Sequence, residues 1–424
     1  MKIEQLHTLF LRFPVICTDT RTITENCLFF ALKGDNFDGN SYAYEALEKG
    51  ASHAIVDDKN LENTETVILV DNVLETLQQL AKYHRQHCNA KIIGLTGSNG
   101  KTTTKELITE VLSQKYNTIA TKGNFNNHIG VPLTLLSIKP DTEVAIVEMG
   151  ANHLREIDFL CQMAMPDYGY ITNFGKAHLE GFGSEEGVIK AKTELYDYLL
   201  ANKKFVFFNA DDPIQVSKLT TTTNKLGFSN QHHNYLFIKF LGADPYVSLK
   251  FKEVQIKSQL VGSYNFTNCS AAVLMGDYFN VPITAIKSAL ENYTPRNNRS
   301  QILEKNNFKI ILDAYNANPS SMKAALENFH ELKADRKIAI LGDMFELGTS
   351  AEKEHQEIAD LARKMNFEEV ILIGENFYKT KTEFPKYASF NALAKKAEKI
   401  ATAEATILIK GSRGMALERL VDLF

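Results

Sequence analysis

The chain has 424 residues, which is longer than one ordinary domain core and predicts about three domains. With 44% hydrophobic and 23% charged residues, its composition is that of a globular protein and excludes collagen-like and disordered chains. The 47 basic and 51 acidic residues give a net charge of −4, so no basic excess attracts nucleic acid or an anionic membrane.

The cysteines and the N-terminus indicate the compartment. The five cysteines are scattered and form no CxxC pair, as is usual where thiols stay reduced. Glu4 stands where a signal peptide would be basic and then apolar, and no apolar run reaches the ~18 residues of a membrane helix. We therefore expect a cytoplasmic monomer that binds no nucleic acid and inserts into no membrane.

Residues 1–86 predict a small mixed α/β domain. Apolar runs at 28–32, 53–57 and 67–70 predict short strands, and the apolar spacing over 73–87 predicts a helix. This helix ends in the polar stretch HRQHCNAK, which marks the first boundary.

Residues 87–296 predict a second domain, which begins with a strand at 92–96, a glycine-rich turn and a helix from Lys101. Strand-like runs recur with helical stretches between several of them, which predicts a parallel sheet covered on both faces. The residue pattern over 227–259 predicts neither a helix nor a strand. The further strand-like runs and the last helical region of this unit are 144–149, 168–174, 204–210 and 265–278.

Residues 297–424 predict a third, Rossmann-like α/β domain, reached through the polar linker YTPRNNRSQ at 293–301. Its apolar runs alternate with helices that begin near Pro319 and Ser350. The predicted fold class is therefore α/β, with a small N-terminal domain, a central P-loop domain of the ATPase type and a C-terminal Rossmann-like domain. The predicted strands lie in KIILDAY, KIAILGDM, EVILIG and ATILIKGS.

The sharpest chemical signal is TGSNGKTTT, which lies between a predicted strand and a predicted helix. Glycines let several backbone N–H groups point at one anion, and the helix N-terminus adds its dipole. Lys101 can then reach the terminal phosphates of ATP, and the Thr102 hydroxyl can join a Mg²⁺ shell. An ordinary glycine turn is the alternative, which the Gly-Lys-Thr run between strand and helix disfavours. The predicted ATP-binding residues here are Thr96, Gly97, Ser98, Asn99, Gly100, Lys101, Thr102 and Thr103.

Two further residues could complete the ATP site from neighbouring strands. Glu148 ends the strand VAIVEM, where ligands of parallel sheets bind, and His178 follows another strand at the same edge. Each has a plain alternative: a solvated strand-end glutamate, and a surface or core histidine. For Lys192, in EEGVIKAKTELY, the residues alone favour a solvated helix lysine.

The third domain offers its own polar residues. Asp313 ends a strand and could bind a ribose, whereas Asn318 before Pro319 could simply cap the next helix. Arg299 could reach a phosphate or remain a surface charge. In LIKGSRGM, Ser412 and Arg413 form a second possible anion site, suited to a carboxylate-bearing substrate.

Taken in order, these runs resemble the Mur ligase family of bacterial cell-wall enzymes over nearly the whole chain. The motifs DAYNANPSSM and LGDMFELG are typical of the members that attach D-alanyl-D-alanine to UDP-N-acetylmuramoyl-tripeptide. The D-N-P-R motif of the diaminopimelate-adding member is absent. The resemblance carries further motifs in the first two domains: TDTRTITENCLFFALKGDNFDGN, TGSNGKTTT, KGNFNNHIGVPLTLL, VAIVEMGAN and TNFGKAHLEGFGS.

The resemblance implies a role for individual residues. Thr102, Glu148, His178 and a carbamylated Lys192 would hold one or two Mg²⁺ ions, and the last three with Lys101 would be catalytic. Asn265 and Asn268 would lie against the adenine, while Arg299 and Asp313 would contact phosphate and ribose. The residues that would bind the UDP-tripeptide or the dipeptide are Thr20, Arg21, Asn124, Asn126, Asn127, Ser412 and Arg413.

The activity implied by the resemblance is amide formation through an acyl phosphate made with ATP. UDP-N-acetylmuramoyl-tripeptide would supply the carboxylate and D-alanyl-D-alanine the amine. The alternatives are a sibling Mur or folylpolyglutamate-type ligase with another acceptor, a nucleotide-dependent switch or transporter subunit, and a binding scaffold without activity.

Overall fold

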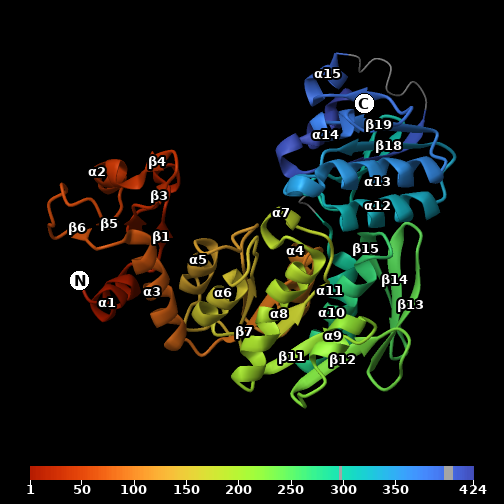
Figure 1. The fold of residues 1–424 in the computed structure, drawn as a ribbon. Helices are drawn as coiled ribbons and strands as arrows, with labels where there is room; N and C mark the ends of the chain where they lie inside the picture. Colours follow the sequence, from red (N-terminus) through yellow and green to blue (C-terminus); the bar gives the residue numbers. More distant parts are fainter. Residues whose placement is uncertain (296–297, 396–403) are drawn as a thin grey trace.

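The computed structural model describes residues 1–295, 298–395 and 404–424, and these residues form three large sheets one after another along the chain, besides a two-stranded ribbon. Figure 1 shows the N-terminal sheet on one side of the large central sheet, with the third sheet on another side. The predicted boundary at residues 296–297 lies outside the described residues.

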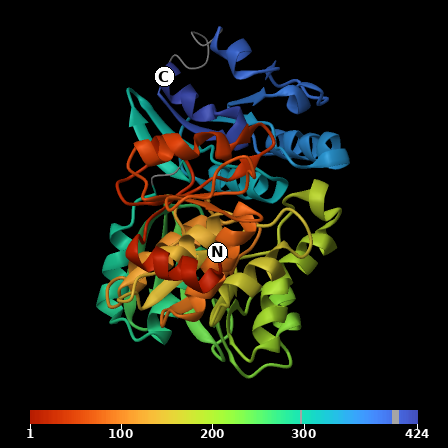
Figure 2. The same ribbon diagram turned by 90° about the vertical axis from the view of Figure 1, so that its left-hand side faces the viewer.

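The N-terminal domain is a four-stranded parallel sheet in the order β1-β2-β5-β6, with helices on both faces. The three predicted strands and the predicted helix are all present. In Figure 2 this domain faces the viewer. Its elements are α1 (Ile3–Arg12), β1 (Ile16–Cys17), β2 (Leu28–Phe30), the ribbon β3 (Lys33–Gly34) and β4 (Phe37–Asp38), α2 (Ala43–Glu48), β5 (His53–Val56), β6 (Val67–Leu69) and α3 (Val73–Gln86).

Helix α3 fastens this domain to the central one. Near its C-terminal end Arg85 is buried, donates to Ala164 O at 3.1 Å and forms an ion pair with Asp167 at 2.9 Å. His84 lies 3.0 Å from both His7 Nε2 and the carbonyl oxygen of Ile138. These polar contacts surround apolar packing that is continuous between the two domains, so α3 holds the first domain in a defined position.

The central sheet has nine strands in the order β15-β14-β13-β12-β11-β10-β7-β9-β8. Its parallel part has both faces buried: in β9, Val144 and Ile146 join one core while Ala145 and Val147 join the other. The parallel strands are β7 (Lys91–Thr96), β8 (Thr118–Ala120), β9 (Val144–Glu148), β10 (Tyr168–Ile171), β11 (Phe205–Asn209) and β12 (Lys225–Ser229).

The remaining strands add an antiparallel part to the predicted parallel sheet. β13 (Leu236–Ala243) pairs in parallel with β12, but β14 (Tyr246–Phe251) and β15 (Val254–Val261) extend the edge in antiparallel fashion. The undecided stretch 227–259 is therefore mostly strand. In β14 buried residues alternate with half-buried ones, which is typical of an antiparallel strand covered on one face rather than of a doubly covered strand.

Helices cover both faces of the central sheet. α4 (Lys101–Leu112) packs with α10 (Asn265–Tyr278), which has the bounds that its sequence predicts. The other central helices are α5 (Gly130–Leu136), α6 (Glu156–Ala164), α7 (Leu179–Phe182), α8 (Glu185–Ala201), α9 (Pro213–Lys218) and α11 (Ile283–Asn292).

The third sheet has the order β16-β17-β21-β18-β19-β20, parallel except for the β16–β17 hairpin. Helices on both faces bury it, as predicted for a Rossmann-like domain. Its elements are β16 (Gln301–Lys305), β17 (Phe308–Asp313), α12 (Pro319–Glu331), β18 (Lys337–Gly342), α13 (Ala351–Lys364), β19 (Glu369–Ile373), α14 (Glu375–Tyr378), β20 (Lys386–Tyr387), α15 (Phe390–Ala394) and β21 (Ala405–Lys410). Within the described residues, every helix is too short or too polar to cross a membrane.

The histidine pair between α1 and α3 predicts a pH-dependent stability. Burial, with smaller contributions from His84 and His87, lowers the pKa of His7 to about 4. Unfolded His7 takes up a proton near pH 6.5, whereas folded His7 stays neutral down to about pH 4. This contribution to stability is therefore complete above pH 6.5 and is lost as the pH falls toward 4.

We expect the thermal unfolding midpoint of His7→Gln to fall less between pH 7.5 and pH 4.5 than that of the unmodified chain. Circular dichroism melts at the two pH values measure this difference. His233→Gln, which changes an exposed histidine, is the control and should follow the unmodified chain. An unchanged pH dependence in His7→Gln would contradict the assignment.

Candidate active site

A cavity of about 910 Å³ lies where the edge of the central sheet meets the third domain. Residues of both domains line it. Most residues that the sequence predicts for the site are among them: Ser98, Asn99, Gly100, Lys101, Thr102, Thr103, Asn124, Asn126, Asn127, Glu148, His178, Asn265, Asn268, Arg299, Asp313, Ser412 and Arg413.

The phosphate-type loop follows β7 and depends on two glycines in left-handed backbone. At Gly97 (φ +142°) an added Cβ would lie 1.9 Å from Thr172 Oγ1, and at Gly100 (φ +76°) it would lie 2.6 Å from Asn268 Oδ1. No other residue fits such close approaches without displacing the neighbours. The loop therefore packs directly on the end of β10 and on α10.

The end of β10 holds the loop in place. The strand stops at Ile171, earlier than the predicted 174. The Thr172 N–H still donates to Thr96 O of β7 at 2.9 Å, but the side chains of the residues after Ile171 bond to the loop. Thr172 Oγ1 donates to Asn99 O at 2.6 Å, and the Asn99 N–H donates to Asn173 Oδ1 at 3.1 Å. The loop is thus rigid before any ligand binds.

Lys101 begins α4 and folds back over the loop. Its Nζ donates to Gly97 O at 2.7 Å and to Ser98 O at 3.3 Å. Burial lowers the pKa of Lys101, and the carboxylates of Glu148 and Glu346 oppose that effect. The ammonium is the positive charge in the centre of the loop, where a phosphate would lie.

Glu148 is a buried carboxylate that faces the loop. Its Oε1 accepts from Thr102 Oγ1 at 3.3 Å and from Asn126 Nδ2 at 2.8 Å. Its Oε2 has no hydrogen-bond donor among the described residues, and Lys105 Nζ lies 3.6 Å from it. A buried carboxylate oxygen left without a donor is available to a cation, so the solvated alternative for Glu148 is wrong.

His178 contacts the third domain. Its Nδ1 lies 2.5 Å from Oε2 of Glu346, a residue of the LGDMFELG motif. This contact, more than any other, lowers the pKa of the Glu346 carboxyl. In the described part of the chain, no three His, Cys, Asp or Glu side chains stand close enough together to hold a metal ion alone.

Lys192 is fully buried in α8, so the solvated-lysine interpretation is wrong. Its Nζ donates to Ala151 O at 3.2 Å and lies 5.0 Å from the centre of the Phe182 ring. Burial, reinforced by the charge of Lys101, moves the pKa of Lys192 well below its usual value. Ala151 itself lines the cavity, so the amine lies just behind the cavity wall.

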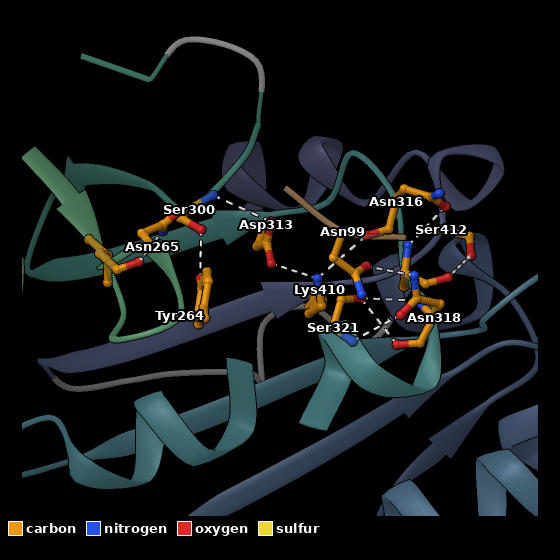
Figure 3. A network of polar contacts seen from close by, with 12 residues as sticks. Asn99, Tyr264, Asn265, Ser300, Asp313, Asn316, Asn318, Ser321, Lys410 and Ser412 are labelled. Atoms are coloured by element: carbon orange, nitrogen blue, oxygen red, sulfur yellow. Dashed lines mark hydrogen bonds and ion pairs between the residues drawn. The ribbon is translucent and has the colours of Figure 1, made fainter. Parts of the chain in front are cut away.

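Two asparagines of α10 lie next to the phosphate-type loop. Asn268 Oδ1 accepts from Thr104 Oγ1 at 3.0 Å, and Asn268 Nδ2 donates to Asn265 Oδ1 at 2.7 Å. Beside them, the Tyr264 hydroxyl lies 2.7 Å from Ser300 Oγ of the third domain (Figure 3).

The third domain reaches the loop through the N-terminus of α12. Asn318 caps this helix, as the capping alternative predicted, by accepting the Ser321 N–H at 2.9 Å. The same side chain also donates from Nδ2 to Asn99 Oδ1 at 2.7 Å, so capping and loop contact coexist (Figure 3). Next to it Asp313 Oδ2 pairs with the buried Lys410 at 2.5 Å.

Tyr315 joins two predicted anion-binding residues. The Arg299 guanidinium lies 3.8 Å from the centre of the tyrosine ring, and that of Arg413 lies 5.1 Å from it. Arg413 Nη1 also donates to the tyrosine hydroxyl at 3.2 Å. The ring therefore orients both guanidinium groups at the cavity.

Four other predicted residues lie outside the cavity. Thr96 and Gly97 do not line the cavity: Thr96 ends β7 and its Oγ1 donates to Met149 O, whereas Gly97 belongs to the loop but packs on Thr172. Thr20 and Arg21 belong to the first domain, where Arg21 is 86% exposed and pairs with Asp19 at 2.6 Å.

Sequence reasoning missed Glu346, Lys410 and Tyr315 as site residues. Glu346 lies in the motif LGDMFELG, Lys410 in LIKGSRGM and Tyr315 in DAYNANP. Their partners lie far away in the chain, so only the fold pairs them.

Family models match the three domains in order. The models are described as the Mur ligase family catalytic domain (residues 13–85), the Mur ligase middle domain (95–276) and the Mur ligase glutamate ligase domain (298–413).

Curated relatives and solved structures agree with these matches. The UDP-N-acetylmuramoyl-tripeptide–D-alanyl-D-alanine ligase of Bacillus subtilis is 35% identical, over 96% of this chain and 92% of its own length. The ligase of the same name from Escherichia coli is 33% identical, over 97% of this chain and 93% of its own length. Crystal structures of MurF from Acinetobacter baumannii and of MurF from Thermotoga maritima in complex with ADP superpose with TM-scores of 0.84 and 0.85. Their identities are 29% and 25%, over 96% and 98% of this chain and 92% and 97% of those chains.

Removing the Lys101 ammonium is expected to abolish ATP consumption. In Lys101→Met the loop keeps its glycines but loses the central charge, and we expect turnover to fall by about 10²-fold or more. ADP release in the presence of both candidate substrates measures it. Lys139→Met, at an exposed lysine, is the control. Retained turnover in Lys101→Met would remove Lys101 from the reaction.

Proposed function

This chain belongs to the Mur ligase family, and we propose that it joins D-alanyl-D-alanine to UDP-N-acetylmuramoyl-tripeptide at the expense of ATP. One observation carries the proposal: a single cavity holds both the phosphate-type loop and the Tyr315–Arg413 pair of the third domain. A nucleotide and a carboxylate-bearing acceptor can therefore bind within reach of each other. The names of the full-length relatives, and ADP in one of them, support the same substrates.

The reaction proceeds in two steps. The tripeptide carboxylate attacks the γ-phosphorus of ATP, which forms an acyl phosphate and releases ADP. The dipeptide amine then attacks the acyl carbon, and phosphate leaves with the C–O bond electrons as the amide forms. An α-amino group has a pKa of about 8, so a useful fraction is already neutral near pH 7.

The chain's own residues supply charge and order for these steps. Lys101 neutralises charge that spreads over the transferred phosphoryl oxygens. Arg299 and Asp313 contact phosphate and ribose, and Asn265 and Asn268 lie against the adenine. Ser412 and Arg413 hold the carboxylate of the dipeptide, for which the bidentate guanidinium is suited.

The donors around Glu148 fit magnesium. Glu148 Oε2 is buried without a hydrogen-bond donor, and the Thr102 hydroxyl lies beside the same carboxylate. Mg²⁺ prefers oxygen ligands and is usually held by one or two carboxylates together with substrate phosphates. Thr102, Glu148 and His178 would hold it, and it would offset the negative charge of the triphosphate.

Lys192 fits a carbamate that would add a further oxygen ligand. A neutral amine attacks CO₂ and releases a proton to give a carbamate, and burial lowers the pKa of this amine, which favours its neutral form. Its position behind Ala151 places the product next to the cavity that Glu148 lines.

The three domains divide the substrates among them. Residues 1–86 hold the uridine nucleotide with Thr20 and Arg21, residues 87–296 hold ATP, and residues 297–424 hold the dipeptide. Asn124, Asn126 and Asn127 line the cavity and contact the tripeptide part. We propose that the protein is a cytoplasmic monomer; the five cysteines are all free, as is usual in a reducing compartment.

A phosphate-release assay over a matrix of UDP-muramoyl peptides and D-amino dipeptides tests the proposed function. We expect release only when a UDP-muramoyl-tripeptide and D-alanyl-D-alanine are present together with ATP and Mg²⁺. Release with another acceptor in place of the dipeptide would assign a sibling activity. No ATP consumption with any pair would overturn the proposal.

The carbamate predicts chemical rescue. Lys192→Ala should lose activity because a metal-binding carboxylate is missing, and acetate or formate should restore part of it by entering the space of the deleted side chain. Phosphate release with increasing carboxylic acid measures the rescue. Lys190→Ala changes an exposed lysine of the same helix and should neither lose activity nor respond to acids. Full activity in Lys192→Ala without acid would contradict the carbamate.

A further inference from the structure

Ser300, at the entrance to the third domain, has a strained backbone. Its φ of +49° is left-handed, a conformation that is uncommon outside glycine. Such a conformation costs free energy and persists where the surroundings impose it. Ser300 immediately precedes β16, so its backbone sets the direction in which the chain enters the third domain. The contacts that hold Ser300 therefore also bear on the residues that this domain brings to the cavity.

The central domain holds Ser300 through one tyrosine. The Tyr264 hydroxyl and Ser300 Oγ share a hydrogen bond of 2.7 Å across the domain boundary (Figure 3). Burial raises the pKa of Tyr264, and the charge of the nearby Asp313 carboxylate adds to this effect, so the hydroxyl keeps its proton at neutral pH. Tyr264 is itself held in place, because its ring packs on Gly262, where an added Cβ would collide with Tyr264 Cε1. Thr267 Oγ1 also donates to the Tyr264 carbonyl oxygen at 3.1 Å.

Ser300 in turn contacts the carboxylate of Asp313. The Ser300 N–H donates to Asp313 Oδ1 at 3.3 Å, and Lys410 Nζ donates to Asp313 Oδ2 at 2.5 Å (Figure 3). Each carboxylate oxygen thus has a donor of its own, and the two bonds together restrict rotation of the group. A carboxylate oxygen can accept two hydrogen bonds, so each retains one acceptor position. Asp313 lines the cavity, and a ligand there can use these two positions.

Two acceptor positions on one fixed carboxylate match a pair of neighbouring hydroxyl groups. The 2′ and 3′ hydroxyls of a ribose are such a pair, and each has one O–H to donate. Tyr264, Ser300 and Asp313 line the same cavity as the phosphate-type loop, so a nucleotide on the loop lies in the same space. Asn265, which follows Tyr264 in the chain, is proposed to lie against the adenine, and the ribose is the next group along the nucleotide.

We propose that Tyr264 is a positioning residue for the sugar of the nucleotide. It holds Ser300 in the left-handed conformation that turns the Ser300 N–H toward Asp313, and it thereby fixes the carboxylate that receives the ribose hydroxyls. The proposal rests on the proposed function in one respect, because it takes Asp313 as the ribose contact. It adds that a tyrosine of the central domain determines how well a residue of the third domain selects the sugar.

A hydroxyl that merely joined the two domains would give a different result from one that positions Asp313. Its loss would weaken the binding of every adenine nucleotide by the same factor, whatever the sugar. The loss of a hydroxyl that positions Asp313 affects only nucleotides that have ribose hydroxyls to donate. A comparison of ADP with 2′,3′-dideoxy-ADP therefore separates the two roles.

The first test is the binding of these two nucleotides to the full chain with Mg²⁺, measured by isothermal titration calorimetry without turnover. The test variant is Tyr264→Phe, which removes only the hydroxyl. Tyr116→Phe is the matched control, because it removes a tyrosine hydroxyl that donates to Phe279 O at 2.7 Å inside the central domain. Thermal melts confirm that each variant is folded.

We expect Tyr264→Phe to bind ADP about 3–10-fold more weakly than the unmodified chain, as for the loss of one hydrogen bond, and to bind 2′,3′-dideoxy-ADP equally well. Tyr116→Phe should bind both nucleotides as the unmodified chain does. An unchanged ratio of the two dissociation constants in Tyr264→Phe would overturn the proposal, whether both affinities stay constant or fall together. Failure of the unmodified chain to bind ADP would count against the proposed function instead.

The second test determines whether Tyr264 acts through Ser300. Ser300→Ala removes the other partner of the hydrogen bond and keeps the backbone N–H that contacts Asp313. We expect Ser300→Ala to weaken ADP binding as Tyr264→Phe does. The double variant should bind ADP no more weakly than either single variant, because both changes delete the same bond. Fold-changes that multiply in the double variant would overturn the route through Ser300.

Discussion

The close packing of the phosphate-type loop on its neighbours is the constraint on which the rest of the site depends. Gly97 lies against Thr172 and Gly100 against Asn268, with no room for a side chain at either position. Because β10 and α10 are themselves buried in the central cores, the loop takes its position from the whole domain. A rigid loop loses little conformational entropy when an anion binds, and its N–H groups need no rearrangement to face a phosphate.

The third domain adds a second set of contacts to the same loop. Asn318 and Asn99 share a hydrogen bond, and the Lys176 N–H donates to Ser320 Oγ at 2.8 Å, so the N-terminus of α12 lies on the rim of the phosphate site. The nearby Asp313–Lys410 pair is mostly buried, where opposite charges are weakly screened. The central and third domains are thereby connected through polar side chains, whose partners change more readily than those of a packed apolar core.

Local signals predicted much of this architecture, and long-range pairings account for what they missed. The Gly-Lys-Thr loop, the bounds of α10 and the cap at Asn318 each depend on a few neighbouring residues, so the sequence shows them directly. The burial of Lys192 could not be predicted in this way, because several residues near Lys192 in α8 are charged. Only packing against α7 and the cavity wall removes the Lys192 amine from water. The contact of Glu346 with His178 joins two domains, and no periodicity in the sequence indicates that two such distant residues meet.

A reaction through an acyl phosphate places a strict demand on the order of events. Water is an abundant competing nucleophile, so an acyl phosphate formed before the amine is in place would be hydrolysed and the ATP wasted. On the proposed division of substrates, the geometry meets this demand if the phosphoryl-transfer site is complete only when the third domain is docked. Glu346 and Asn318 both come from that domain, and both touch residues of the phosphate-type loop or its rim. Activation of the carboxylate would then be tied to the docking of the domain that we propose delivers the amine.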